Sequence, residues 1–322
     1  YSTNADVLEK LKDKHPIIPA IMDYRMLTKL KSTYADGLLK VIDPDSRIRT
    51  NFQMTVTATG RLSSTEPNLQ NIPIRDAIGR PIREAFIPST SDRLLLSADY
   101  SQVELRLMAH LSGDESLCEA FRKGEDIHTA TAAKIFGKSI DEVTAEERRR
   151  AKTANFGIIY GISPFGLAQR LDIPRSEAKA LIDGYFASYP KVKEYMDNTI
   201  AEAHQTGCVS TIFSRRRYLD GINSNNANTR ALAERNAINA PIQGSAADIM
   251  KMAMVAVARE FKEQKLRSKL ILQVHDEIVI DLVAAEREVV ESIVRRCMEG
   301  VAELSIPLIV DVGVGKNWLE AH

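Results

Sequence analysis

Cysteine is scarce in this sequence of 322 residues. Its three cysteines, Cys118, Cys208 and Cys297, lie far apart and show no metal-ligand spacing. This pattern argues against a disulfide framework and indicates buried thiols in a reducing compartment. The sequence also lacks an apolar run long enough to span a bilayer and a basic-then-apolar leader, so a soluble intracellular protein is expected.

An excess of either charge is missing as well, since 43 Lys and Arg balance 43 Asp and Glu. Zero net charge would normally count against nucleic-acid binding, which draws on a basic surface. The arginines nevertheless gather in three segments, residues 75–83, 148–152 and 215–217, whereas acidic residues gather in stretches such as 141–147. We therefore expect a surface with separate basic and acidic regions.

The segment 144–161 predicts a helix whose two ends are both signalled. Thr144 followed by Glu147 is a capping-box start, and Gly161 stands where a C-terminal cap is expected. Four residues at intervals of four share one face of this helix: Arg148, Lys152, Phe156 and Tyr160. The two cations suit a polyanion such as a triphosphate, and the aromatic rings suit a stacked nucleobase. A solvated surface helix anchored by its aromatic residues is an equally good interpretation of this stripe.

The rest of the chain alternates between two kinds of pattern. Helical periodicity covers residues 4–35, 102–213, 245–264 and 285–303. Short apolar or alternating runs predict strands at 47–57, 83–87, 94–98 and 308–314, and a β-hairpin from 269–274 and 278–282. Because strands precede and follow the long helical block, the pattern indicates one α+β sheet domain interrupted by a helical domain.

Two aspartates stand at the ends of predicted strands. Asp99 follows the buried strand 94–98, and Asp276 lies at the tip of the hairpin. If these strands are neighbours, the two carboxylates would attract Mg²⁺, which takes water and phosphate oxygens as its other ligands. An exposed turn aspartate is the ordinary alternative. Glu277 beside Asp276, and Glu104 five residues after Asp99, favour the metal site.

These segments resemble the motifs of a known family. Residues 99–106, 148–161 and 273–277 resemble motifs A, B and C of the family A DNA polymerases. Further resemblance covers the family's primer-template segment (59–64 with 68–73) and its minor-groove segment (239–244). All five occur in the family's order and cover nearly the whole chain, with the bacterial DNA polymerase I group as the expected nearest kin.

The resemblance implies an α+β right-hand polymerase architecture, in which an antiparallel palm sheet carries a large helical fingers insertion and a partial helical thumb. The implied parts are a partial thumb (1–45), the first part of the palm (46–101), the fingers (102–235) and the second part of the palm (236–322). The family's polymerase domain normally starts further upstream, so an N-terminally truncated domain is expected. Because phosphate contacts supply most non-specific affinity, we expect a distributive polymerase or a poorly active fragment.

The resemblance also implies roles for single residues. Asp99, Asp276 and the backbone carbonyl of Tyr100 would hold two Mg²⁺ ions, and Glu277 is a weaker catalytic candidate. The residues implied to bind the dNTP are Arg148, Lys152, Phe156, Tyr160, Glu104, His128 and Gln102. Among these, Glu104 would leave no room for a 2′-hydroxyl, which favours deoxynucleotides over ribonucleotides. A lone helical histidine is usually structural, and that alternative stays open for His128.

The residues implied to contact the primer-template duplex form the largest group: Arg61, Asn68, Gln70, Asn71, Arg75, Arg235, Asn239, Gln243, His275, Lys29 and Arg25. In the minor groove, arginine and amide side chains meet acceptors that every base pair presents, so they sense pairing without reading sequence. Pro241 is expected to break any helix between Asn239 and Gln243. For Lys29 and Arg25, solvated basic residues are the alternative.

Taken together, the resemblance implies Mg²⁺-dependent, template-directed DNA synthesis from dNTPs in replication and repair. The expected protein is a monomer without a membrane partner, in the bacterial cytoplasm at the nucleoid. Two other classes fit part of the pattern. A two-metal nuclease or phosphatase would use Asp99 and Asp276 but has no need for the stripe at 148–160, and a non-catalytic DNA-binding module would need neither aspartate.

Overall fold

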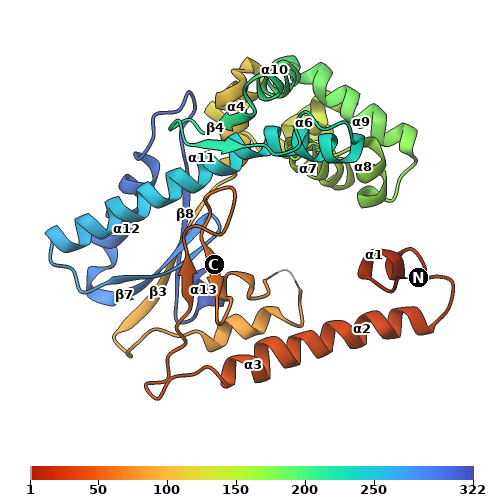
Figure 1. Cartoon of the computed structure of the whole chain (residues 1–322). Coiled ribbons are helices and arrows are strands. Elements are labelled where there is room, and N and C mark those ends of the chain that lie inside the picture. The colour runs from red at the N-terminus through yellow and green to blue at the C-terminus, as the bar shows by residue number, and fades with distance from the viewer. Residues whose placement is uncertain (1, 75) are drawn as a thin grey trace.

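The described part of the chain, residues 2–74 and 76–322, is built around a four-stranded antiparallel sheet. Figure 1 shows the computed structural model, with this sheet at the lower left. The strand order is β6-β7-β3-β8, and the bounds are β3 (Arg93–Tyr100), β6 (Lys269–Val274), β7 (Glu277–Val283) and β8 (Val310–Gly315). The strand predicted at 94–98, the hairpin and the last strand are therefore confirmed, with small shifts at their ends.

Both faces of the sheet are covered, and alternate residues of each strand point to opposite faces. Leu96 and Ala98 belong to the larger core, with residues of α4 (Val103–Ser112), α11 (Ala227–Glu263) and α12 (Arg287–Glu299). Leu95 belongs to the smaller core, with Trp318 of the short C-terminal helix α13 (Trp318–Ala321). Because Asp99 has the same parity as Leu95, its side chain lies on the face that α13 covers.

A helical block separates β3 from the β6–β7 hairpin, as predicted. It lies at the upper right in Figure 1 and consists of α4, α5 (Glu115–Arg122), α6 (Ile127–Phe136), α7 (Ala145–Ile159), α8 (Pro164–Leu171), α9 (Arg175–Ser188) and α10 (Pro190–Thr206). The side chains of Asp114, Asp126 and Ser163 cap the N-termini of α5, α6 and α8. A short hairpin of β4 (Cys208–Ser210) and β5 (Arg216–Tyr218) then leads into α11.

Helix α7 has both of its predicted ends. The backbone N–H of Glu147 donates to Oγ1 of Thr144 at 3.2 Å, and the Glu147 carboxylate accepts the N–H of Thr144 at 2.9 Å. Beyond the last turn, Gly161 is left-handed with φ +66°, and the N–H of Ile162 reaches back to the carbonyl of Gly157 at 2.9 Å. This pair of features is the Schellman arrangement, which ends a helix.

The helix predicted at 245–264 is the second half of α11, which is 37 residues long and contains Pro241. The expected break at Pro241 is therefore wrong. A proline inside a helix costs about 3 kcal/mol, because it removes one hydrogen bond and crowds the preceding turn. Ile238 and Ile242, on either side of it, are buried to 5% and 0% exposure, and packing of this kind holds the helix together. The predicted domain boundary between residues 235 and 236 lies inside α11.

The segment before β1 is helical. Helices α1 (Ala5–Glu9) and α2 (Ile17–Lys29) lie on either side of Pro16, whereas Pro19 is in the first turn of α2. Helix α2 continues through the π-helix η1 (Leu30–Ala35) into α3 (Asp36–Leu39). In Figure 1 this segment extends along the lower right, with α2 pointing away from the sheet. Among the helices of the described residues, none combines the length and apolarity that a membrane span needs.

The strands predicted between residues 47 and 87 differ most from the structure. The run at 47–57 contributes only β1 (Asn51–Gln53), which pairs with β2 (Ser63–Thr65) ahead of the 3₁₀-helix η2 (Leu69–Asn71). The strand expected at 83–87 is wrong, because this run belongs to the 3₁₀-helix η3 (Arg80–Ala85) and its end. Arg83 is buried against the ring of Trp318, so the segment packs on α13 instead of pairing with another strand.

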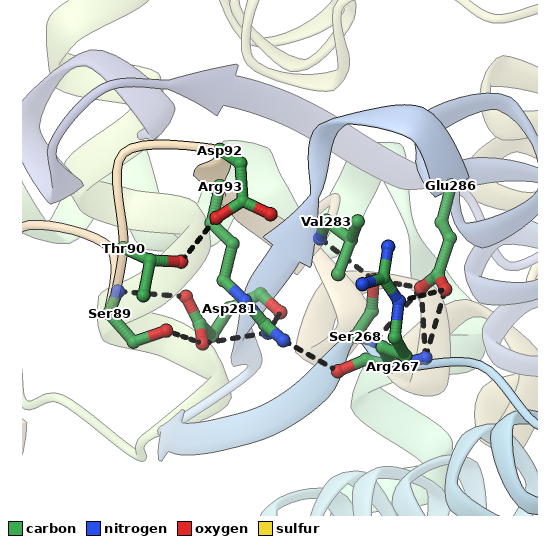
Figure 2. A network of polar contacts seen from close by, with 9 residues as sticks. All are labelled: Ser89, Thr90, Asp92, Arg93, Arg267, Ser268, Asp281, Val283 and Glu286. Atoms are coloured by element: carbon green, nitrogen blue, oxygen red, sulfur yellow. Dashed lines mark hydrogen bonds and ion pairs between the residues drawn. The ribbon is translucent and has the colours of Figure 1, made fainter.

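Two carboxylates, the buried Asp281 and the half-buried Glu286, fix the end of the sheet opposite Asp99 (Figure 2). Asp281 of β7 accepts hydrogen bonds from Oγ of Ser89 at 2.6 Å and from Nη1 of Arg93 at 2.9 Å. Glu286, in the 3₁₀-helix η5 (Ala284–Glu286), accepts the N–H and the hydroxyl of Ser268. These bonds tie the loops before β3 and β6 to β7, so the register of the three strands is fixed.

Candidate active site

The two aspartates predicted to meet do lie at adjoining strand ends. In the antiparallel pair of β3 and β7, Asp99 stands opposite Glu277. The N–H of Tyr100 donates to the backbone carbonyl of Asp276 at 3.1 Å, which places the hairpin tip beside the end of β3. On its other side Asp99 faces Asp311 of β8. The sheet therefore carries a row of acidic residues across β7, β3 and β8, with Asp276 next to it.

Neighbouring charge and burial disfavour ionisation of both aspartates. Burial, followed by the charges of Asp276 and Glu277, raises the pKa of Asp99 to about 7. Burial also raises the pKa of Asp276, and the charge of Glu104 adds to this rise. Oδ1 of Asp99 is buried and has no hydrogen-bond partner within the described residues. A cation would satisfy this oxygen and relieve the repulsion between the carboxylates.

These oxygens fit a hard divalent cation. Two carboxylates and a backbone carbonyl are oxygen donors, which Mg²⁺ prefers over nitrogen and sulfur. Within residues 2–74 and 76–322, no three His, Cys, Asp or Glu side chains form a complete ligand set. A divalent cation held at Asp99 and Asp276 would therefore take its other ligands from backbone, water or a bound phosphate.

Glu277 is held by several neutral donors and a histidine. Its Oε1 accepts hydrogen bonds from Oγ of Ser97 at 2.7 Å and from Nε1 of Trp318 at 3.0 Å, and Nδ1 of His322 lies 3.5 Å from Oε2. Burial would raise the pKa of Glu277, but the bonds from His322, Trp318 and Ser97 outweigh it and lower the pKa. Glu277 is therefore an ionised, fixed carboxylate beside Asp99. Its catalytic role stays a prediction.

The predicted stripe on α7 lies on one helix. Arg148 pairs with Asp126 at 2.6 Å, and although burial opposes it, this bond lowers the pKa of Asp126 to about 2. Lys152 is exposed, and its charge reaches the ring of His128. The Phe156 ring lies 5.6 Å from that same ring, centroid to centroid. The cations and the first aromatic of the stripe thus surround one histidine on α6.

His128 is buried, and the residue that binds it, Asn155, was not among the predicted site residues. Nδ2 of Asn155 lies 3.0 Å from Nδ1 of His128, and both side chains are at most 3% exposed. Burial lowers the pKa of His128 to about 4, with Asp126 opposing this and Lys152 and Arg148 adding to it. The ring is therefore neutral at neutral pH. A polar residue at the middle of a helix, flanked by apolar positions, is the feature that could have pointed to Asn155.

Glu104 joins the stripe to the aspartates. Its Oε2 accepts a hydrogen bond from the hydroxyl of Tyr160, and its Oε1 pairs with Nη2 of Arg61 at 2.5 Å. The side chain of Glu104 is 9% exposed and that of Arg61 is 30% exposed. Burial and the charge of Glu104 raise the pKa of the Tyr160 hydroxyl. Because Glu104 also acts on Asp276, it lies between the two parts of the site.

The predicted duplex contacts on α11 and the hairpin lie around this junction. Arg235, Asn239 and Gln243 are all on α11, and a Cβ added to Gly161 would come within 3.1 Å of Cγ of Arg235. His275 is exposed at the turn between β6 and β7 and has a left-handed φ of +54°. Helix α11 thus runs past the end of the stripe.

The remaining predicted contacts divide into three groups. Gln70 is buried and donates to Oε1 of Gln273 at 3.1 Å, whereas Asn68 and Asn71 are exposed beside it. Lys29 is exposed at the end of α2, and Nη2 of Arg25 bonds to Oγ1 of Thr3 at 3.1 Å. Arg75 lies outside the described residues. The end of α2 that carries Lys29 leads into η1, whose Tyr34 hydroxyl donates to the backbone carbonyl of Asn71 at 2.7 Å.

Two predicted site residues have strained backbone. Gln102, which turns the chain from β3 into α4, has φ +53°, and His275 has φ +54°. Left-handed conformations are costly for residues other than glycine and gather at functional sites. Gln102 follows Asp99 by three residues, and His275 precedes Asp276 directly. Both strained positions thus lie next to the two aspartates.

An α+β fold of this kind, with paired carboxylates at the end of an antiparallel sheet and a basic-aromatic helix beside them, is the fold of a DNA polymerase domain. The model of DNA polymerase family A matches residues 1–320 of the chain. The chain belongs to DNA polymerase family A. Proteins of this family use divalent metal ions.

Curated relatives support the same assignment. DNA polymerase I of Caldicellulosiruptor bescii is 54% identical over 321 residues, covering 99% of this chain and 38% of the relative. DNA polymerase I of Bacillus subtilis is 53% identical over 322 residues, covering 100% of this chain and 37% of the relative. The chain thus spans less than two fifths of the length of these proteins.

A solved structure has the same fold along the whole chain. It is the POL domain of Pol1 from M. smegmatis in complex with DNA primer-template and dNTP. The TM-score is 0.95 at 48% sequence identity, and the match covers 100% of this chain and 57% of the other. The predicted α+β polymerase architecture is therefore confirmed.

Proposed function

We propose that this chain catalyses template-directed DNA synthesis. It would transfer deoxynucleotidyl groups from dNTPs to the 3′-hydroxyl of a primer and release pyrophosphate, in DNA replication and repair. The observation that carries the proposal is the pairing of β3 with β7, which sets Asp99 beside Asp276 on the same sheet end that Glu104 links to α7.

We propose two Mg²⁺ ions as the metal cofactor, held by Asp99, Asp276 and the backbone carbonyl of Tyr100. When bound, such ions lower the pKa of an attacking hydroxyl and stabilise negative charge on the leaving pyrophosphate. The chain itself supplies a preformed site, because Asp99 keeps a buried oxygen without a partner among the described residues. Glu277 stays fixed by its three contacts and contributes negative charge next to Asp99.

The stripe on α7 is proposed as the dNTP site. Arg148 and Lys152 would bind the triphosphate, with His128 beside them, and Phe156 would pack on the sugar and base. Tyr160 and Glu104 would close the far side, where the buried Glu104 leaves no space for a 2′-hydroxyl. Gln102 is proposed as a further contact, since its turn lies between Asp99 and Glu104.

Primer-template DNA is the proposed partner. The proposed contacts are Arg61, Asn68, Gln70, Asn71, Arg75, Arg235, Asn239, Gln243, His275, Lys29 and Arg25. The parts of the hand are proposed as partial thumb (1–45), palm (46–101 and 236–322) and fingers (102–235). A monomer is proposed, acting on the bacterial chromosome in the cytoplasm.

Primer extension tests this proposal. With a labelled primer on a longer template, Mg²⁺ and four dNTPs, the chain should lengthen the primer, and Asp276→Ala should abolish the products. Asp311→Asn is the matched control, since it removes an acidic side chain from the same face of the sheet and should leave extension in place. Shortening of the primer would indicate a nuclease, and DNA binding without any dependence on Asp276 would indicate a non-catalytic module.

A further inference from the structure

Asn155 is a buried amide whose hydrogen bond to His128 has no role in the proposed function so far. It lies in the interior of α7 and is 1% exposed. Asparagine costs up to about 0.7 kcal/mol in a helix relative to alanine, and burying an amide costs about 1–3 kcal/mol more unless it is hydrogen-bonded. The buried residues near it on α7, Ala151, Ala154 and Ile158, are apolar. An apolar side chain would suit this position better if packing were its whole purpose.

The bond between these residues fixes which ring nitrogen of His128 carries the proton. An amide NH₂ group donates and cannot accept, so Nδ1, at 3.0 Å from Nδ2 of Asn155, is the acceptor. A neutral imidazole carries a single N–H. Because the ring is neutral at pH 7, its proton must lie on Nε2.

The second ring nitrogen of His128, Nε2, is left for another partner. Within the described residues Nε2 has no hydrogen-bond partner, and this nitrogen is not fully buried. The charges of Asp126, Lys152 and Arg148 act on the ring, with Arg148 paired to Asp126 and Lys152 exposed, and Phe156 packs beside it. An N–H next to two cations is suited to an acceptor that carries negative charge, such as a phosphate oxygen.

We propose that Asn155 is a positioning residue for nucleotide binding, because it holds His128 as the Nε2–H tautomer that donates to the triphosphate. The inference rests on the dNTP site proposed above. It deepens that proposal, since it explains why a neutral histidine accompanies Arg148 and Lys152. A charged side chain there would add a third cation, whereas the neutral ring donates a directional hydrogen bond and adds no charge. Without Asn155 the ring is free to rotate and to exchange its proton between the two nitrogens.

Nitrogen NMR of the full chain tests the tautomer without any catalytic readout. With ¹⁵N-labelled histidine, the ring-nitrogen signals of His128 are identified as those that are absent from the spectrum of His128→Gln. At pH 7 Nδ1 should have the shift of an unprotonated nitrogen and Nε2 that of a protonated one. A proton on Nδ1 would overturn the proposal, since Asn155 would then accept through Oδ1. In Asn155→Leu the two shifts should move toward each other, and unchanged shifts would also contradict the assignment.

Thr131→Val is the matched control for this experiment. Thr131 is buried on α6 like His128, but its hydroxyl bonds to Tyr189 at 3.1 Å and to the carbonyl of Ile127. Its loss should leave the His128 shifts as in the wild type. A matching change in both variants would mean that general loosening of α6, and not Asn155, alters the ring.

Kinetics separates positioning from a structural role. Removing one hydrogen bond of this kind should raise the KM for dNTP in Asn155→Leu about 3- to 10-fold and leave kcat nearly unchanged. In the His128→Ala background the same change should have no further effect, because Asn155 acts through His128. An equal rise in both backgrounds would overturn the inference. If the wild type extended no primer, the proposed function would fail, and the NMR result alone would decide the role of Asn155.

Discussion

The hydroxyl of Tyr160, at the end of α7, donates a hydrogen bond to Oε2 of Glu104 on α4. The other carboxylate oxygen of Glu104 pairs with Arg61, from the segment before the sheet. One buried carboxylate on α4 therefore links the end of α7 to the loop that precedes β2. Any change at Glu104 should affect both substrate choice and the position of Tyr160.

Glu104→Ala should relax the choice of sugar. Removing this side chain opens space next to the nucleotide and leaves the hydroxyl of Tyr160 without its acceptor. We expect incorporation of ribonucleotides relative to deoxynucleotides to rise by about 10-fold or more, which corresponds to at least about 1.4 kcal/mol of lost discrimination. Single-nucleotide extension with each dNTP and rNTP measures this ratio. Glu115→Ala, an exposed change on α5, is the control, and an unchanged ratio in Glu104→Ala would refute the steric role.

Asp99→Asn should abolish extension and stabilise the metal-free protein. The folded-state pKa of Asp99 is about 7, above the ordinary value of 3.8, so the folded protein binds this proton more tightly than the unfolded chain. Wild-type stability from this group is thus fully present below about pH 4 and is lost as the pH rises to about 7 and beyond. We expect Asp99→Asn to be more stable by about 1–2 kcal/mol at pH 8 and equal at pH 4.

Urea unfolding in a chelating buffer checks this expectation, with Asp311→Asn as the control for removing a carboxylate from the same row. A variant that is less stable than the wild type at pH 8 would show that Asp99 is satisfied by contacts in the metal-free protein. That result would contradict the account of Asp99 as a site kept ready for a cation.

Trp318→Phe should weaken the packing of the C-terminal helix α13 on the sheet and so lower the stability of the protein. Phenylalanine keeps the ring beside Phe86 and Arg83 but loses the N–H that donates to Glu277. A hydrogen bond to a charged group contributes about 1.5–3 kcal/mol, so a loss of about 2 kcal/mol in the free energy of unfolding is expected. Ser97→Ala removes the other donor to the same oxygen and should lower the free energy of unfolding by a somewhat smaller amount. An unfolding midpoint equal to the wild type in both variants would exclude this network as a source of stability.

His204 should make stability depend on pH. Its Nδ1 lies 2.8 Å from Oδ1 of Asn223 and its Nε2 lies 3.0 Å from Glu234, so both ring nitrogens face acceptors. Nδ2 of Asn223 donates to the carbonyl of His204, which fixes the orientation of the amide. These bonds raise the pKa of His204 above 6.5. Their contribution is therefore fully present below about pH 6.5 and is lost as the pH rises through the folded-state value.

Thermal unfolding of the wild type and of His204→Gln across pH 6 to 9 measures this contribution. The difference in Tm between the two proteins should shrink by about 1–2 °C over this range, because the pair is partly exposed and screened. His110→Gln, at a site without an acidic partner among the described residues, is the control. A constant difference across the range would contradict the double-donor geometry.

Local signals in the sequence predicted the parts of the site that depend on short stretches of chain. The capping box at Thr144, the glycine at 161 and the hairpin around Asp276 all act within a few residues, and all three are confirmed. The helix break at Pro241 was wrong because burial along a helix of 37 residues outweighs one missing hydrogen bond. A single-residue propensity says little where packing decides.

Contacts between distant residues could not be predicted in this way. Trp318 and Glu277 are 41 positions apart, and nothing in either local sequence identifies the other as a partner. Asn155 and His128 are 27 positions apart, and they meet because α6 and α7 pack side by side. The strand expected at 83–87 failed for the same reason, since its residues pack on a C-terminal helix that the local pattern does not reveal.

The length of helix α11 and the proline inside it determine where this helix can bend. At about 1.5 Å per residue, its 37 residues span about 55 Å, and the hairpin β4–β5 packs against its middle, where Nε of Arg215 pairs with Asp248 at 2.8 Å. A sharp kink in a helix breaks backbone hydrogen bonds where it occurs, but at Pro241 one N–H is already missing. The backbone hydrogen bond that this helix cannot form would join residue 241 to the carbonyl of Ala237, so bending costs least in the turn from Ala237 to Pro241. If the helical block tilts relative to the sheet, we expect α11 to bend in this turn, which carries the proposed duplex contact Asn239.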